Sequence, residues 1–296
     1  MNDDWTLNGA AQVLPHDLRQ ELDRLNGDWA ERTEELRLRR GFPMTVNVGG
    51  TERQSGGSIV TEEHLRMVLE NASQASAHTV LEQVKRGYVT LRGGHRIGLC
   101  GTVARRDGEI TTLRYLTSLS IRVARPVKGL SLTLLEKLTE AGQFQSTLIL
   151  APPGAGKTTL LRDMVRVLSD GGTRVGLADE RGEVAALWQG EPQFDVGRHT
   201  DILDGCPKAE GMSILLRGMN PQVMAADEIT DLRDVQAVAE ACGCGVALLA
   251  TAHGGSVDDL KRRPVYRALL EHSVFRRVVL IQRRGERRVM NVEVLS

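Results

Sequence analysis

The sequence is poor in aromatic residues, has no excess of charge of either sign and contains few cysteines. Its 296 residues include three Trp, three Tyr and four Phe, which argues against a protein that stacks single-stranded nucleic acid on aromatic rings. The 38 basic and 38 acidic residues give a formal net charge of +0, whereas a protein that coats nucleic acid is usually basic. The composition therefore disfavours a nucleic-acid partner.

Long apolar runs are also missing. No stretch approaches the ~20 apolar residues that a helix needs to cross a bilayer, and the polar start MNDDWTLNGA is unlike a secretory signal peptide. We therefore expect a cytoplasmic protein that reaches a membrane only peripherally, through partners. Cys242 and Cys244 form a C-x-C pair without a second pair of ligands, so we expect reduced thiols and no zinc site.

The first part of the chain has the pattern of a mixed α+β module. Alternating apolar residues indicate strands, and apolar residues at helical spacing indicate helices. The predicted elements are strands at 35–39, 44–48 and 118–126, a hairpin at 88–103, and helices at 61–73 and 79–87. Since the pattern changes near residue 127, we predict an N-terminal α+β accessory domain over 1–127.

Residues 128–296 alternate short apolar strands with amphipathic helices, which predicts an α/β domain with a parallel sheet covered on both faces. The predicted strands lie at 147–151, 174–180, 222–228 and 246–253, and the helices at 157–169, 211–219 and 233–242. Ligands of such sheets bind beyond the carboxyl ends of the strands. The arginine-rich segment 274–290 interrupts two apolar runs with charges, which favours a solvated β-hairpin over a nucleic-acid surface.

Residues 151–158, APPGAGKT, match the phosphate-binding pattern G-x-x-x-x-G-K-[ST] except at the first position, where alanine replaces glycine. Backbone N–H groups of such a loop, and the helix that follows it, bind phosphate oxygens. Lys157 would contact the β- and γ-phosphates, and the Thr158 hydroxyl would bind Mg²⁺. Ala151 is tolerable at the strand end if its φ is negative. The predicted ATP-binding residues are Pro153, Gly154, Ala155, Gly156, Lys157, Thr158 and Thr159.

Acidic residues follow two of the predicted strands. Asp227 and Glu228 end the strand at 222–228, where Asp227 can hold the Mg²⁺ shell and Glu228 can polarise the water that attacks the γ-phosphate. Glu180 ends the strand at 174–180 and would face the same crevice. Glu180 is therefore an alternative to Glu228 as the residue that positions the water.

The strand at 246–253 ends in His253, which we predict to sense the γ-phosphate. Phosphoryl transfer also needs a cation near the developing negative charge, and an arginine supplied in cis or in trans can serve. The sequence does not choose among the candidates Arg122, Arg125, Arg198 and Arg217.

With these motifs in place, the chain resembles the stage III sporulation protein AA family of spore-forming bacteria. The resemblance covers most of the chain and is carried by GYVTLRGGHRIGLCGTV, SLSIRVARP, APPGAGKTTLLRD, LADERGE, DILDGCPKAEGMSILLRGMNPQVMAADEI and ATAHGG. The chain departs from the family pattern at Ala151 and in the small residues of VMAADE, which bear on turnover rate more than on binding.

The resemblance implies a RecA-like P-loop ATPase domain over 128–296, related to the traffic ATPases of type II and type IV secretion. It also implies homo-hexamers, and work with other sporulation channel proteins at the membrane between mother cell and forespore. By the resemblance, the nucleotide site contains Lys157, Thr158, Asp227, Glu228 and His253, and Glu180 belongs to an acidic box after the second strand.

The leading prediction is an ATP-hydrolysing oligomeric motor that serves a membrane-associated assembly. A nucleic-acid motor of the same fold is an alternative, although it would need a basic inner surface. The chain has no N-K-x-D stretch for guanine, which disfavours a GTPase, and a small-molecule kinase would turn over little ATP without an acceptor. A nucleotide-gated scaffold with little hydrolysis is the remaining alternative, because the phosphate loop is altered.

Overall fold

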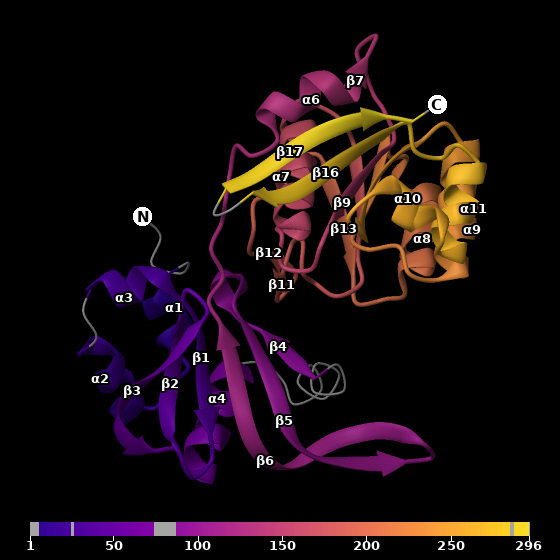
Figure 1. Ribbon diagram of the computed structural model, residues 1–296. Coiled ribbons are helices and arrows are strands. Elements are labelled where there is room, and N and C mark those ends of the chain that lie inside the picture. Colours follow the sequence, from indigo (N-terminus) through magenta and orange to yellow (C-terminus); the bar gives the residue numbers. More distant parts are fainter. Residues whose placement is uncertain (1–5, 25–26, 74–86, 285–286, 296) are drawn as a thin grey trace. The chain divides into compact units, whose positions relative to one another are not determined.

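Figure 1 shows a computed structural model of the chain, which describes all residues except 1–5, 25–26, 74–86, 285–286 and 296. The chain divides into two units, one formed by Met1–Pro126 with Leu187–Gln193 and the other by Val127–Ala186 with Phe194–Ser296. The sequence-based division near residue 127 did not include the return of 187–193 to the first unit. The helix predicted at 79–87 falls mostly outside the described residues. Within those residues, no helix is long and apolar enough to span a membrane.

The first unit is built on an antiparallel sheet with the strand order β3-β2-β1-β6-β5-β4. Its strands are β1 (Thr33–Arg39), β2 (Pro43–Val48), β3 (Thr51–Ile59), β4 (Tyr88–Thr90), β5 (Arg96–Arg106) and β6 (Glu109–Arg122). Its helices are α1 (Leu7–Ala11), α2 (His16–Asp23), α3 (Gly27–Arg32) and α4 (Glu62–Ser73). The predicted strands 35–39 and 44–48, the hairpin and helix 61–73 are confirmed. The strand predicted at 118–126 is correct only to Arg122, as the end of the longer β6, and α1–α3 were not predicted.

Strand register explains the core of this unit. Leu36 in β1 lies opposite Val46 in β2 and Ile121 in β6, so the three apolar side chains share one face of the sheet. All three are fully buried, and Leu18 of α2 and Leu65 of α4 belong to the same apolar cluster. Side chains alternate between the two faces of a strand, which is why the period-two pattern predicted these strands correctly.

The second unit contains a sheet with the order β13-β10-β14-β15-β9-β16-β17. Its strands are β9 (Thr147–Ala151), β10 (Val175–Asp179), β13 (Thr200–Asp204), β14 (Val223–Ala226), β15 (Ala247–His253), β16 (Arg277–Arg284) and β17 (Arg287–Val294). All neighbouring strands pair in parallel except β16 and β17. A small hairpin of β7 (Thr139–Glu140) with β8 (Gln143–Phe144) also belongs to this unit, whereas the hairpin of β11 (Leu187–Trp188) with β12 (Glu191–Pro192) lies in the segment 187–193 of the first unit.

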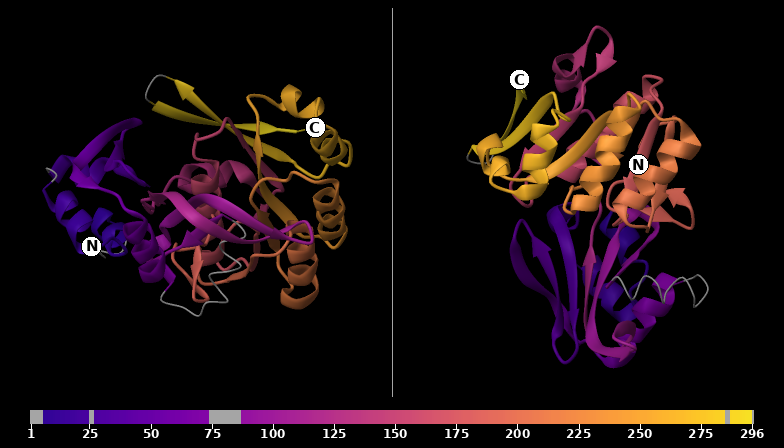
Figure 2. Two further views of the ribbon diagram at one scale, coloured as in Figure 1. Left: turned by 90° about the horizontal axis from the view of Figure 1, so that it is seen from below. Right: turned by 90° about the vertical axis from the view of Figure 1, so that its right-hand side faces the viewer.

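Helices cover both faces of this sheet. They are α6 (Leu132–Leu138), α7 (Lys157–Asp170), α8 (Lys208–Met219), α9 (Leu232–Gly243), α10 (Val257–Lys261) and α11 (Pro264–Glu271). Figure 1 shows α7 on one side of β9 and α8–α11 on the other, and the right-hand view in Figure 2 looks onto the orange and yellow helices. The predicted α/β alternation is confirmed, whereas β13, α10 and α11 were not predicted.

Small side chains allow α8 to pack closely on the sheet. A Cβ placed on Gly211 of α8 would lie 3.1 Å from Cys206 Sγ and 3.6 Å from the Cβ of Ala178 in β10. Ala226 of β14 is fully buried in the same apolar cluster. Ala226 of the VMAADE stretch thus lies in the same buried core as Met212 and Leu215 of α8.

The C-terminal hairpin differs from its prediction. Strands β16 and β17 pair in antiparallel fashion, so the hairpin itself is confirmed. It is not fully solvated, because Val278, Val279 and Ile281 are at most 1% exposed. The reason is that β16 also pairs in parallel with β9, which makes it an interior strand of the sheet.

Asp163 of α7 anchors the segment that opens the second unit. This carboxylate is 2% exposed, accepts hydrogen bonds from the backbone N–H of Gly129 at 3.0 Å and of Ser131 at 2.8 Å, and pairs with Arg166 at 2.8 Å. Burial alone would raise the pKa of Asp163, but the hydrogen bonds from Arg166 and Ser131 lower it below its ordinary value.

We expect Asp163→Ala to lower the free energy of unfolding by about 3 kcal/mol, because the variant leaves buried donors without an acceptor. Since folding lowers the pKa of Asp163, the stabilisation is present above about pH 4 and is lost as the pH falls further. Urea titrations followed by circular dichroism at pH 7 would measure the effect. Asp170→Ala is the matched control, because Asp170 reaches the same arginine from a half-exposed position and should change stability by less than about 1 kcal/mol.

Candidate active site

The phosphate-binding loop joins β9 to α7. Gly154 has φ +71° and Gly156 has φ +99°, both in the left-handed region that favours glycine. Ala151 is the last residue of β9 and is not among the described residues with positive φ, so the missing glycine imposes no backbone strain there. Lys157 is the first residue of α7, so the backbone N–H groups at that helix end are available to an anion.

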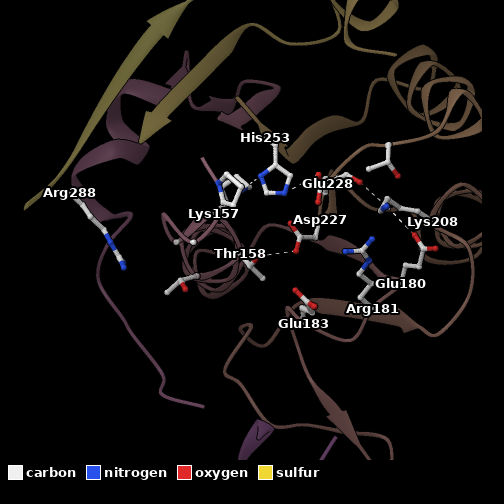
Figure 3. A pocket seen from close by; sticks show the side chains of 15 residues that line it. Lys157, Thr158, Glu180, Arg181, Glu183, Lys208, Asp227, Glu228, His253 and Arg288 are labelled. Carbon is white, nitrogen blue, oxygen red and sulfur yellow. Dashed lines mark hydrogen bonds and ion pairs between the residues drawn. The ribbon is translucent and has the colours of Figure 1, made fainter. Parts of the chain in front are cut away.

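The loop opens onto a cavity of about 440 Å³, a size typical of small-molecule sites (Figure 3). Every predicted site residue lines it except Ala155, which lines a second cavity of about 100 Å³ together with Ile281, Gln282 and Arg288. The residues around the main cavity are Pro153, Gly154, Gly156, Lys157, Thr158, Thr159, Glu180, Arg181, Glu183, Lys208, Asp227, Glu228, Thr230, His253 and Arg288.

Lys157 is held at the bottom of the cavity by acceptors from two neighbouring strands. Its Nζ lies 2.7 Å from His253 Nδ1 and 3.3 Å from the carbonyl oxygens of Ala151 and Pro152. Burial lowers the pKa of Lys157, against the opposing influence of Glu228 and Asp227. The ammonium group is therefore poorly hydrated, and phosphate oxygens would be strong additional acceptors for it.

His253 connects this lysine to Glu228. If the Lys157 ammonium donates to Nδ1, the ring proton of a neutral His253 is on Nε2, which lies 3.1 Å from Glu228 Oε1. Figure 3 shows the three side chains in a row along one side of the cavity. A change at the lysine can therefore be transmitted to the glutamate through one imidazole ring.

The hydroxyl of Thr158 and the carboxylate of Asp227 form the candidate metal site. Thr158 Oγ1 donates to Asp227 Oδ2 at 2.9 Å, and Thr251 Oγ1 donates to Asp227 Oδ1 at 2.6 Å. Mg²⁺ prefers six oxygen ligands at about 2.0–2.1 Å, which places neighbouring ligands about 2.9 Å apart. The chemistry and spacing of this pair therefore fit a magnesium ion, with phosphate and water oxygens supplying the remaining ligands.

Glu228 has an unusual backbone conformation. Its φ of +38° lies in the left-handed region, which a residue with a side chain adopts only when its surroundings enforce it. Its N–H donates to Thr251 Oγ1 at 2.9 Å, and its carbonyl accepts from Lys208 Nζ at 2.8 Å. Both ends of the residue are thus fixed by side chains, and its carboxylate is directed towards His253.

Glu180 follows β10 on a loop that begins with a buried carboxylate. Asp179 is 1% exposed and accepts from the backbone N–H groups of Glu183, Val184 and Ala185, and burial raises its pKa. These hydrogen bonds close the loop that carries Glu180 to the cavity.

Arg162 of α7 supports the same loop from below. It donates to the carbonyls of Glu183 at 2.7 Å and Val184 at 2.6 Å and stacks on the Phe194 ring at 3.6 Å from the centroid. Burial lowers the pKa of Arg162 to about 10. The α7 helix thus carries both the phosphate loop and the support of the acidic loop.

Among the described residues, none of the four predicted arginines lines the main cavity, whereas Arg181 and Arg288 do. Sequence reasoning also gave no role to Lys208. Lys208 lies in the DILDGCPKAEGM block that carries the resemblance, but a single lysine after a proline has no spacing pattern that would identify it. Arg288 was not predicted as a site residue, because the segment 274–290 was expected to form a solvated hairpin.

Comparison with known proteins gives consistent results. The family model described as "Sporulation stage III, protein AA" matches residues 7–292. "Stage III sporulation protein AA" of Bacillus subtilis (strain 168) is 38% identical over 292 residues, covering 94% of this chain and 91% of that protein. The family model thus also includes most of the first 35 residues, in which the sequence motifs gave little signal.

Two solved structures share the fold at low sequence identity. The Legionella pneumophila ATPase DotB matches with a TM-score of 0.61 and 18% identity, covering 95% of this chain and 80% of that one. The pilus retraction motor PilT with bound ADP matches with a TM-score of 0.62 and 17% identity, covering 94% and 82%. They confirm the predicted class, a RecA-like α/β domain preceded by a domain with an antiparallel sheet. Since the family match spans nearly the whole sequence, the chain belongs to the stage III sporulation protein AA family.

Proposed function

We propose that this chain is an ATP-hydrolysing oligomeric motor of the secretion-ATPase type that acts in sporulation, at a channel complex between mother cell and forespore. One observation carries the proposal: the phosphate loop and the ends of β14 and β15 bring Lys157, Thr158, Asp227, Glu228 and His253 around one cavity. A glycine-rich turn with an incidental lysine would not require a carboxylate within hydrogen-bonding distance of the threonine next to that lysine. The sporulation role rests on the relative from Bacillus subtilis, which carries that name.

In this proposal Lys157 binds the β- and γ-phosphates, and the backbone of residues 153–159 surrounds them. Thr158 and Asp227 would hold Mg²⁺, which would neutralise negative charge on the phosphates. Glu228 accepts a proton from the attacking water, since its carboxylate faces the cavity. His253 detects the state of the site, because it contacts both the lysine and this glutamate.

The active form in this proposal is a homo-hexamer that works at the membrane through other sporulation channel proteins. The described part of the chain has no helix that could span a bilayer, so a membrane partner would have to hold it there. A ring would also allow an arginine from a neighbouring copy to complete the site, which can raise the rate about 10³–10⁵-fold.

The test is the rate of ATP hydrolysis per chain, measured against protein concentration, with the molecular mass determined at each point. We expect the rate per chain to rise about tenfold or more as the mass increases from monomer to ring, because sites shared between copies form only on assembly. Without magnesium the rate should fall to background.

Other outcomes separate the alternatives. ATP binding without phosphate release at any mass would contradict hydrolysis and support a nucleotide-gated scaffold. A rate that is independent of mass would contradict the ring, and stimulation by single-stranded DNA would favour a nucleic-acid motor.

A further inference from the structure

Lys208 is a buried cation that contacts both the loop after β10, which carries Glu180, and the segment after β14, which carries Glu228. Its side chain is 7% exposed, and its Nζ lies 3.1 Å from Glu180 Oε2, 2.8 Å from the Glu228 carbonyl oxygen and 3.9 Å from Asp234 Oδ2. These groups come from the ends of β10 and β14 and from the start of α9. Figure 3 shows Lys208 between the two glutamates, on the far side of the cavity from the phosphate loop.

Local structure does not explain a lysine at this position. Lys208 is the first residue of α8, where the helix dipole disfavours a positive charge. Ion pairs in the interior are weak sources of stability, because desolvation opposes the attraction between the charges. Neither helix formation nor the free energy of burial therefore explains a lysine at this position.

The contacts of Lys208 also argue against a role as a ligand of the phosphates. Its two hydrogen bonds go to Glu180 and to the Glu228 carbonyl, and its third neighbour is the carboxylate of Asp234. The Asp234 carboxylate in turn accepts from the backbone N–H groups of Thr230 and Asp231, which follow Glu228 in the chain. Lys208 thus contacts the backbone of Glu228, whose φ is positive. It also faces Asp234, whose carboxylate binds the backbone that follows Glu228.

We propose that Lys208 is a positioning residue that holds the Glu228 backbone in its left-handed conformation and fixes Glu180 beside it. This inference rests on the proposed ATP hydrolysis. The backbone N–H of Glu228 donates to Thr251 Oγ1, and its backbone C=O accepts from Lys208 Nζ. Loss of Lys208 frees the carbonyl, so the residue relaxes and its carboxylate moves away from the water that it must orient. A displacement of about 1 Å can lower a rate about 100-fold.

The two glutamates then have different duties. Glu180 is paired with Lys208, whereas Glu228 contacts His253. Lys208 thus makes Glu228 the residue that acts on water, and Glu180 the partner that keeps the lysine in place.

The experiment compares wild type with Lys208→Met, which keeps most of the length of the side chain and removes its charge. We expect kcat for ATP hydrolysis to fall about 100-fold, while the Kd for ATP stays within about threefold, because the phosphate loop is untouched. Lys208→Arg, which retains the charge, should recover part of kcat. Lys261→Met is the matched control, since Lys261 pairs with Asp258 on the surface, and its kcat should equal that of wild type.

A double variant separates positioning from charge neutralisation. Glu180→Gln/Lys208→Met removes both charges of this pair together, so Glu180 does not lose its cation, while Asp234 keeps its backbone donors at Thr230 and Asp231. We expect its kcat to be about tenfold or more below that of Glu180→Gln alone, because the Glu228 carbonyl has still lost its donor.

The outcomes distinguish the role of Lys208 from the proposed function. Equal kcat values for the double variant and Glu180→Gln would overturn the positioning role, as would an unchanged kcat for Lys208→Met. A parallel loss of ATP affinity would make Lys208 a binding residue and would equally overturn it. Wild-type protein that binds ATP but releases no phosphate in any assembly state would instead overturn the proposed function, and this role of Lys208 with it.

Discussion

Replacing Lys157 with alanine should abolish tight ATP binding, with Kd rising about 100-fold or more. Hydrogen bonds to a charged group contribute about 1.5–3 kcal/mol each, and this ammonium group can donate to two phosphate groups at once. The loop contains no other cationic side chain between Ala151 and Thr159, and Arg288, which also lines the cavity, comes from β17 and not from the loop. Calorimetric titration of each protein with ATP and magnesium measures the change.

The pKa of Lys157 adds a second expectation. Because burial lowers this pKa, ATP affinity should decline at alkaline pH earlier than it would for an ordinary lysine, whose pKa is about 10.4. The control is Lys137→Ala on the exposed side of α6, which should bind ATP as wild type does. Unchanged affinity in Lys157→Ala, with the fold intact by circular dichroism, would contradict the assignment of the phosphate loop.

Glu228→Gln should bind ATP normally and hydrolyse it about 10²–10⁴-fold more slowly, the range expected for loss of a general base. Glutamine keeps the shape of the side chain and can still contact His253, but it cannot accept the proton of the attacking water. Single-turnover phosphate release, measured beside ATP affinity, separates the chemical step from binding.

Glu180→Gln is the direct comparison, because both glutamates line the cavity and only one of them contacts His253. We expect Glu180→Gln to retain more activity than Glu228→Gln. If Glu228→Gln turns over normally while Glu180→Gln does not, the roles of the two residues must be exchanged.

Much of the α/β unit was predictable because its signals are local. An apolar strand before APPGAGKT and an amphipathic helix after it determine the path of the backbone on both sides of the phosphate loop. Parallel strands bring their carboxyl ends together, so Asp227, Glu180 and His253 could be expected near Lys157 from their positions after strands alone.

The parts that were not predicted depend on contacts distant in sequence. The burial of β16 follows from its pairing with β9, about 130 residues earlier in the chain, and its arginines suggested solvent instead. Strand β13 reads TDILD, whose polar residues gave little indication of a strand. The partners of Lys208 come from the ends of β10 and β14 and from the start of α9. No periodicity within the segment around Lys208 indicates that these elements come together.

The position of β16 has a consequence for how the protein is made. The strand that leads into the phosphate loop obtains its partner on one side only when residues 277–284 have left the ribosome. Until then, β9 presents a row of unpaired backbone groups, which is a template for aggregation. We therefore expect a chain that ends before Arg277 to misfold. A premature stop codon near the C-terminus should then lower the amount of soluble protein as much as one in the middle of the sequence.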